Sequence, residues 1–201
     1  MFRRFFVAIT LCGAASVAFA QADAAPPTRL RGTIEKVEPG SLTIQERSGE
    51  VITLAMRDNM PVTEVVPIAL TDIQPGSFIG TAAMPGADGT LVALEVQVFP
   101  ESMRGIGEGH RPWDLQPQSS MTNATVAELV ATPTGRTLKL KYKDGEKTLI
   151  VPATVPVITY KPGDRTLVVP GAKVFVFAAL RDGPPTALRL SAGRNGFAPP
   201  M

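Results

Sequence analysis

Residues 103–123, MRGIGEGHRPWDLQPQSSMTN, contain the only histidine and the only tryptophan of the chain, His110 and Trp113. The imidazole, together with the carboxylates of Glu108 and Asp114, could bind Zn²⁺ or another divalent cation at a compact turn. One histidine with oxygen ligands is a weak zinc signature, because structural zinc sites use more nitrogen or sulfur ligands. The competing interpretation is packing, in which Trp113 anchors an ordered connector on neighbouring domains. We favour packing and keep a metal site as the alternative.

The spacing of this segment disfavours other chemistry. The stretch GIGEGH lacks the Lys-Ser/Thr pair and the following helix of a phosphate-binding loop. A Ser-His-Asp triad would place its members on one connector, with no rigid strand to hold their geometry. We therefore expect no enzymatic activity, no catalytic residue and no cofactor other than the alternative metal ion. The candidate ligand or interaction residues are Arg104, Glu108, His110, Arg111, Trp113 and Asp114.

The N-terminus has the pattern of a secretory signal peptide. Two arginines precede an apolar run, residues 5–19, that is too short to span a bilayer comfortably and ends near the small residues Ala18 and Ala20. This pattern predicts cleavage after Ala20 and a periplasmic protein. The only cysteine, Cys12, lies within the removed segment, so we expect neither a disulfide nor a thiol nucleophile in the exported chain.

Charge and composition narrow the class of partner. Without the two arginines of the signal segment, 18 basic residues balance 18 acidic residues, and aromatic residues make up 6% of the whole chain. Nucleic-acid binding rests on phosphate neutralisation and base stacking, so we expect no nucleic-acid partner. No later segment is apolar enough to cross a membrane. The expected partner is an envelope component or a small ligand.

The chain repeats itself. Residues 32–56 resemble residues 124–152, and residues 60–98 resemble residues 155–192. In the second alignment the pair Pro75-Gly76 falls on Pro170-Gly171, and Leu94 falls on Leu188. Several such matches in one register indicate a tandem duplication.

Each copy reads as short strands separated by turns, which indicates an all-β protein. The strands expected in the first copy are 32–37, 42–47, 51–56, 78–84 and 91–99. Gly49 and Gly145 occupy equivalent hairpin turns, where we expect both to have positive φ. A helical turn is expected at 69–73, and extended chain at the equivalent span of the second copy. We expect two tandem small OB-like β-barrels of about five strands each, joined by an ordered connector. The boundaries are a signal peptide 1–20, barrel one 28–99, connector 100–122, barrel two 123–192 and a flexible tail 193–201.

The order GTI-x-KV, SLTI, SGEVITL, IQPGSFIGTAA and DGTLVALEVQVFPE resembles a family of exported bacterial OB-like barrel domains of unknown function. The connector MRGIGEGHRPWDL followed by SMTNATV resembles a segment of alphaproteobacterial exported proteins of this type. The resemblance implies an envelope location and a small β-barrel, and it supplies no catalytic residues.

The fold class suggests where a ligand would bind. OB-like barrels commonly bind on the face of their second and third strands, which here would include Thr43, Gln45 and Glu46. The sequence therefore predicts a non-enzymatic periplasmic binding or interaction module of unidentified ligand. The alternative is a metal-binding or metal-dependent protein that uses Glu108, His110 and Asp114.

Overall fold

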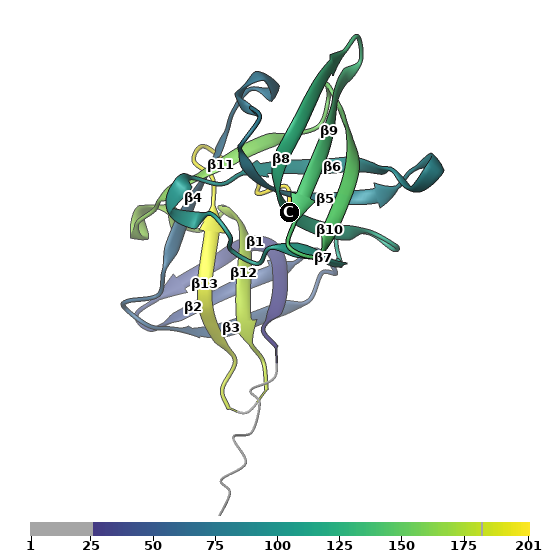
Figure 1. Cartoon of the computed structure of the whole chain (residues 1–201). Helices are drawn as coiled ribbons and strands as arrows, with labels where there is room; N and C mark the ends of the chain where they lie inside the picture. The colour runs from purple at the N-terminus through teal and green to yellow at the C-terminus, as the bar shows by residue number, and fades with distance from the viewer. Residues whose placement is uncertain (1–25, 182) are drawn as a thin grey trace, which may run out of the picture.

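The computed structural model describes residues 26–181 and 183–201, and within them the chain is all-β (Figure 1). Apolar and polar residues alternate along many strands, as in β2, where Leu42 and Ile44 are buried between more exposed neighbours. Short 3-10 turns lie between strands at η1 (Leu70–Asp72), η2 (Ala87–Gly89), η3 (Glu101–Met103) and η4 (Arg165–Leu167). The strands are β1 (Thr28–Glu38), β2 (Ser41–Glu46), β3 (Val51–Met56), β4 (Val62–Pro67), β5 (Phe78–Pro85), β6 (Leu91–Val98), β7 (Gly109–Pro112), β8 (Ser120–Thr132), β9 (Gly135–Tyr142), β10 (Gly145–Pro152), β11 (Val157–Pro162), β12 (Lys173–Ala179) and β13 (Thr186–Ala192).

Five strands close into a barrel, in the order β6-β5-β8-β9-β10. All neighbours along this order are antiparallel. A parallel pairing of β10 with β6, at Leu149 opposite Leu91 and Ile150 opposite Val92, joins the two ends. Closure pairs the two end strands of this order with each other. We refer to these five strands as the second series.

Another five strands, the first series, follow the order β13-β12-β1-β2-β3. A parallel pairing of β13 with β3, at Thr186 opposite Ala55 and Ala187 opposite Met56, links its ends. Figure 1 shows the purple and blue strands β1 to β3 beside the yellow-green strands β12 and β13. The first series therefore combines strands from the two ends of the described chain.

Strands β4 and β11 connect the two series. They pair with each other antiparallel, with Tyr160 opposite Val65. Strand β4 also pairs in parallel with β13, and β11 pairs in parallel with β6. Each of these two strands therefore carries the chain from one series to the other.

The same main-chain hydrogen bonds recur in the two series. In the first, Ile34 N donates to Ala172 O and Gly171 N donates to Ile34 O; in the second, Val126 N donates to Ser77 O and Gly76 N donates to Val126 O. Gly76 and Gly171 have φ of 85° and 86°, a region that favours glycine. Both β1 and β8 contain a register shift directly after these bonds. The two series are therefore built on the same local geometry.

The expected all-β class and a closed five-strand barrel are confirmed, whereas two tandem barrels are not. Strands from residues 28–99 pair with strands from residues 123–192 in both series. The expected strands of the first copy correspond to β1, β2, β3, β5 and β6, and the helical turn to η1. Strands β4 and β7 were not expected. Sequence pattern misses β4 because its pairing partners are distant strands rather than a neighbouring hairpin.

The buried side chains form three clusters. The first series encloses a cluster around Leu42, Leu54 and Leu190, and the second series encloses one around Leu138 and Leu149. A third cluster lies at the crossing strands and contains Val65, Ile158, Phe175 and Met201, with partly buried Trp113, Tyr160, Phe177 and Phe197. Most of the aromatic residues that the structure describes therefore lie where the connector and the C-terminal residues meet the crossing strands.

Three local expectations were wrong. The span of the second copy equivalent to 69–73 was expected to be extended, but it contains the 3-10 turn η4. Gly49 has the expected positive φ of 92°, but Gly145 does not, because it is the first residue of β10 and pairs with Tyr142. Residues 193–201 were expected to be a flexible tail. Met201 is instead 3% exposed, and its main-chain oxygen accepts a hydrogen bond from Arg31 Nε at 2.8 Å. The apolar side chains near the end of this segment pack in the third cluster.

In the part of the chain that the structure describes, no helix is long and apolar enough to cross a membrane. The expected signal peptide, residues 1–20, lies outside the described residues.

Candidate functional site

The first half of the connector is attached to the second series. Strand β7 pairs antiparallel with β8, with His110 opposite Thr122. His110 Nδ1 lies 2.8 Å from Thr122 Oγ1, and Glu108 Oε1 accepts a hydrogen bond from Lys143 N at 3.0 Å. Burial, with smaller contributions from the nearby charges of Lys147 and Arg111, lowers the pKa of His110. The imidazole is therefore held neutral in a structural hydrogen bond.

The second half of the connector is attached to the first series. The Trp113 ring lies 4.1 Å from the Arg29 guanidinium and 5.8 Å from that of Arg111. Asp114 forms ion pairs with Arg29 at 2.9 Å and with Arg31 at 2.7 Å. Although burial raises the pKa of Asp114, these two arginines lower it more, so that the net direction is down. The connector thus fastens both series to each other.

The structure does not bring Glu108, His110 and Asp114 together as a metal site. Glu108 contacts the β9–β10 turn, His110 contacts β8, and Asp114 contacts β1. Within residues 26–181 and 183–201, no group of three or more histidine, cysteine, aspartate or glutamate side chains could hold a metal ion. The remaining candidate, Arg104, pairs with Glu101 at 2.6 Å and donates to Gly76 O at 3.0 Å.

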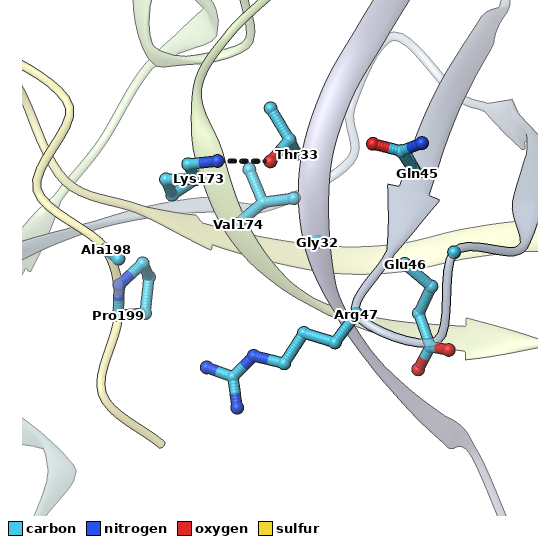
Figure 2. A pocket seen from close by; sticks show the side chains of 10 residues that line it. Gly32, Thr33, Gln45, Glu46, Arg47, Lys173, Val174, Ala198 and Pro199 are labelled. Atoms are coloured by element: carbon cyan, nitrogen blue, oxygen red, sulfur yellow. Dashed lines mark hydrogen bonds between the residues drawn. The ribbon is translucent and has the colours of Figure 1, made fainter.

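A pocket of about 490 Å³ lies on the outer surface of the first series (Figure 2). Its floor is the middle of β1 and the end of β2, its far side is the start of β12, and its rim includes the C-terminal residues. The lining residues are Gly32, Thr33, Gln45, Glu46, Arg47, Gly49, Lys173, Val174, Ala198 and Pro199. The volume falls within the range of small-molecule sites.

Two cationic side chains line this pocket. Figure 2 shows the Arg47 side chain extended toward Pro199 and the Lys173 ammonium beside Thr33. Lys173 Nζ donates to Thr33 Oγ1 at 2.6 Å. Glu46 turns away from Arg47 in Figure 2, and its Oε2 accepts a hydrogen bond from Ser48 Oγ at 2.6 Å. The pocket therefore presents a guanidinium and an ammonium group to an anionic ligand.

Gly32 allows the strands of the pocket floor to approach closely. A Cβ at this position would lie 2.2 Å from the main-chain oxygen of Gln45, which cannot move without disturbing the β1–β2 pairing. The same approach lets Arg47 N donate to Arg31 O at 2.9 Å. A glycine in β1 thus fixes the start of the arginine side chain at the pocket mouth.

A buried polar group lies away from the pocket, in the second series. Glu95 is fully buried; its Oε1 accepts hydrogen bonds from Ala82 N at 2.8 Å and from Gln97 Nε2 at 3.1 Å. Within the described chain its Oε2 has no partner. Burial raises the pKa of Glu95 to about 8, against smaller opposing effects of the two hydrogen bonds. The carboxyl is therefore protonated at neutral pH.

Sequence reasoning found part of this site. Gln45 and Glu46 belong both to the expected binding face and to the pocket. Arg47 and Lys173 were missed, because residues at a hairpin turn and after a Pro-Gly turn usually have solvated side chains. Glu95 was missed as well, although a single acidic residue within the apolar strand LVALEVQV is a visible signal of a buried carboxyl.

No protein-family model matches this sequence, and no curated protein or solved structure is similar enough to count as a match.

Proposed function

We propose that the protein is a non-enzymatic binding module of the periplasm that takes a small anionic ligand in the pocket of the first series. The observation that carries this proposal is the placement of Arg47 and Lys173 in a pocket of about 490 Å³. A guanidinium holds its proton throughout the physiological pH range and binds carboxylate or phosphate oxygens in pairs. These groups suit recognition of an anion rather than proton transfer.

We further propose that the two series are OB-like barrels formed by a duplicated sequence whose copies exchange strands. In an OB barrel the first, second, third, fifth and fourth strands are neighbours in that order, with the third and fifth parallel. The order β1-β2-β3-β13-β12 and its parallel β3–β13 pair support this assignment, as do β8-β9-β10-β6-β5 and the parallel β10–β6 pair. Strands β4 and β11 would be the crossings through which each copy donates its last two strands.

The export step rests on the signal-peptide pattern of residues 1–20. Cell fractionation with N-terminal sequencing tests it. Export predicts a periplasmic protein that begins at Gln21, and an uncleaved cytoplasmic protein would contradict it.

Titration of the full protein with defined anions, followed in amide NMR spectra, tests the binding function. The probes are inorganic phosphate and trigalacturonate, with maltotriose as the neutral control. We expect the anions, but not maltotriose, to shift the signals of Thr33, Gln45 and Lys173. Shifts at none of these residues with either anion would overturn the anionic-ligand proposal.

Two variants make this titration more specific. Arg47→Gln and Lys173→Gln each remove one cation, and each should weaken anion binding by about tenfold, the effect of about 1.4 kcal/mol. Lys161→Gln, at an exposed position outside the pocket, is the matched control for loss of a positive charge. Equal weakening in all three variants would show nonspecific attraction to the protein surface.

The alternative hypothesis from the sequence, a metal-binding function of Glu108, His110 and Asp114, is favoured by no observation of the structure.

A further inference from the structure

Strand β7 pairs with an extension of β8. Gly109 to Pro112 lie opposite Asn123 to Ser120, on the side of β8 that β9 occupies farther along. The β8 residues of this extension pair with β5 on their other side. The connector therefore supplies a short extra strand at the point where β9 no longer reaches β8.

Strand β1 has the same extension without an added strand. Thr28 to Arg31 pair with β12 on one side, and β2 reaches β1 only from Gly32 onward. On the β2 side, the Arg31 carbonyl accepts a hydrogen bond from Arg47 N. Because alternate peptide groups of a strand point the same way, the N–H and C=O groups of Arg29 face this side too. Among the described residues, no main-chain hydrogen bond of Arg29 on this side is found.

The side chains around this edge are basic. Arg29 and Arg31 share one carboxylate, that of Asp114. Arg29 and Arg111 both lie against the Trp113 ring, with their guanidinium groups 4.1 Å and 5.8 Å from its centre. Arg47 adjoins the edge through its main-chain bond to Arg31. Two arginines, the half-buried Arg29 and the buried Arg31, therefore share one aspartate at the unpaired edge, and Arg111 and Arg47 lie near them.

We propose that the edge of β1 at Thr28–Arg31 is a docking site for an extended acidic segment of a partner protein, which adds a strand beside β1 as β7 does beside β8. The main-chain groups of Arg29 would pair with the partner's backbone, and alternate acidic side chains of the partner would face the arginines. This surface is distinct from the anion pocket, although Arg47 lies next to both.

The positive charge of the arginines along the β1 edge favours one kind of partner over another. A second copy of this chain paired through the same edge would bring Arg29 and Arg31 against their counterparts, and like charges in direct opposition destabilise strand pairs. An acidic segment instead supplies carboxylates for guanidinium groups, which form strong charge-assisted hydrogen bonds.

The experiment is a titration of the full protein with the peptide acetyl-Thr-Glu-Val-Asp-Val-Glu-Thr-amide, followed by amide NMR and hydrogen exchange. The comparison peptide has Gln and Asn in place of Glu and Asp. We expect the acidic peptide to shift the amide signals of Arg29 and Arg31 and to slow exchange of the Arg29 amide at least about tenfold at saturation. We expect the neutral analogue to bind at least about tenfold more weakly.

Two substitutions of Arg29 distinguish the contribution of its main chain to peptide binding from that of its side chain. Arg29→Ala removes the guanidinium but keeps the edge N–H, whereas Arg29→Pro removes both. Proline is tolerated where the N–H points away from the neighbouring strand, so both variants should fold, and near-ultraviolet circular dichroism checks this. We expect Arg29→Pro to bind the acidic peptide at least about fivefold more weakly than Arg29→Ala.

Several outcomes would overturn the proposal. Equal binding to Arg29→Pro and Arg29→Ala would show that the edge backbone takes no part. An Arg29 amide already protected in the protein alone would show that another part of this chain, or a second copy, covers the edge. Sedimentation that depends on protein concentration would identify the second copy. Failure of the peptide together with intact phosphate binding would overturn the docking edge and leave the pocket proposal standing.

Discussion

The two series share a strand order and their defining hydrogen bonds, yet different segments cover them. Beside β8 lies the connector, whose β7 completes the sheet and whose Glu108 bonds to Lys143 N. Beside β1 lies the C-terminal segment, which packs Met201 into the third cluster and leaves a pocket next to Arg47. Two similar scaffolds thus differ in exposure because different segments come after their last strands, β6 and β13. Strand β7 pairs with the β8 extension of the second series, whereas a pocket lies on the first series.

A second difference lies at equivalent positions of β6 and β13. Glu95 lies opposite Ala82, next to a register shift, and Arg189 lies opposite Phe177, next to the matching shift. Glu95 is fully buried, whereas the Arg189 guanidinium lies 3.7 Å from the centre of the Phe177 ring. The small side chain of Ala82 leaves room for an inward carboxyl, and the large ring of Phe177 supports an outward cation.

The largest expected effect comes from Glu95→Gln. The folded protein holds this carboxyl at a pKa of about 8 against an ordinary value of 4.5. The contribution of the protonated Glu95 carboxyl to the free energy of unfolding is therefore fully present below the pKa of the unfolded state. It is lost as pH rises toward 8, because over this range the unfolded state releases the proton and the folded state retains it. Glutamine keeps an oxygen acceptor for Ala82 N and has no charge. We expect the variant to be more stable by about 4 kcal/mol near pH 9.

Urea denaturation at acidic and alkaline pH measures this effect. Glu128→Gln, which changes an exposed glutamate of β8, is the control and should leave the pH profile unchanged. The original protein and the Glu95→Gln variant could instead lose the same free energy of unfolding between pH 5 and pH 9, to within about 1 kcal/mol. That result would contradict the buried-carboxyl account.

Core substitutions test whether the proposed strand exchange couples the two series. Leu190→Ala and Leu149→Ala each remove a fully buried side chain, one from each series, and each should lower the free energy of unfolding by about 3 kcal/mol. Because β4 and β11 bind the series together, we expect one thermal transition that shifts in both variants. Two separate transitions, of which each variant moves only one, would show independent barrels.

Asp114→Asn tests the comparison at the connector. The change leaves Arg29 and the more buried Arg31 without their carboxylate, and we expect a loss of about 1 kcal/mol, limited by the exposure of Asp114. The carboxylate form is favoured in the folded state, so this contribution is present above the ordinary pKa of aspartate and fades as pH falls below it. Chemical denaturation at neutral and acidic pH measures it; equal losses at both would contradict the ion-pair account.

The smallest effect is expected for His110→Ala in the presence of zinc. The structure separates His110 from Glu108 and Asp114 by giving each a different contact. We expect no change of melting temperature on addition of zinc or a chelator, in either the original protein or the variant. A zinc-dependent rise that the variant loses would instead establish the metal site that the sequence suggested.

Local patterns in the sequence predicted most strands, because a strand such as β2 shows its buried face by simple alternation. They could not predict which strands pair, since β1 with β12 and β5 with β8 are joined across long stretches of chain. The connector residues were found from their unusual types, but their partners, Arg29 and Arg31, lie in a strand that looks ordinary. The pocket depends on the packing of the C-terminal segment, which composition alone had indicated to be flexible.

Amide hydrogen exchange tests the central comparison most directly. Met121 of β8 and Arg29 of β1 occupy matching strand positions, and their amides face β7 and the unpaired edge respectively. We predict that the Met121 amide exchanges at least about a hundredfold more slowly than the Arg29 amide in the protein alone. Equal protection of the two amides would contradict the account, because it would mean that the first series is covered as completely as the second.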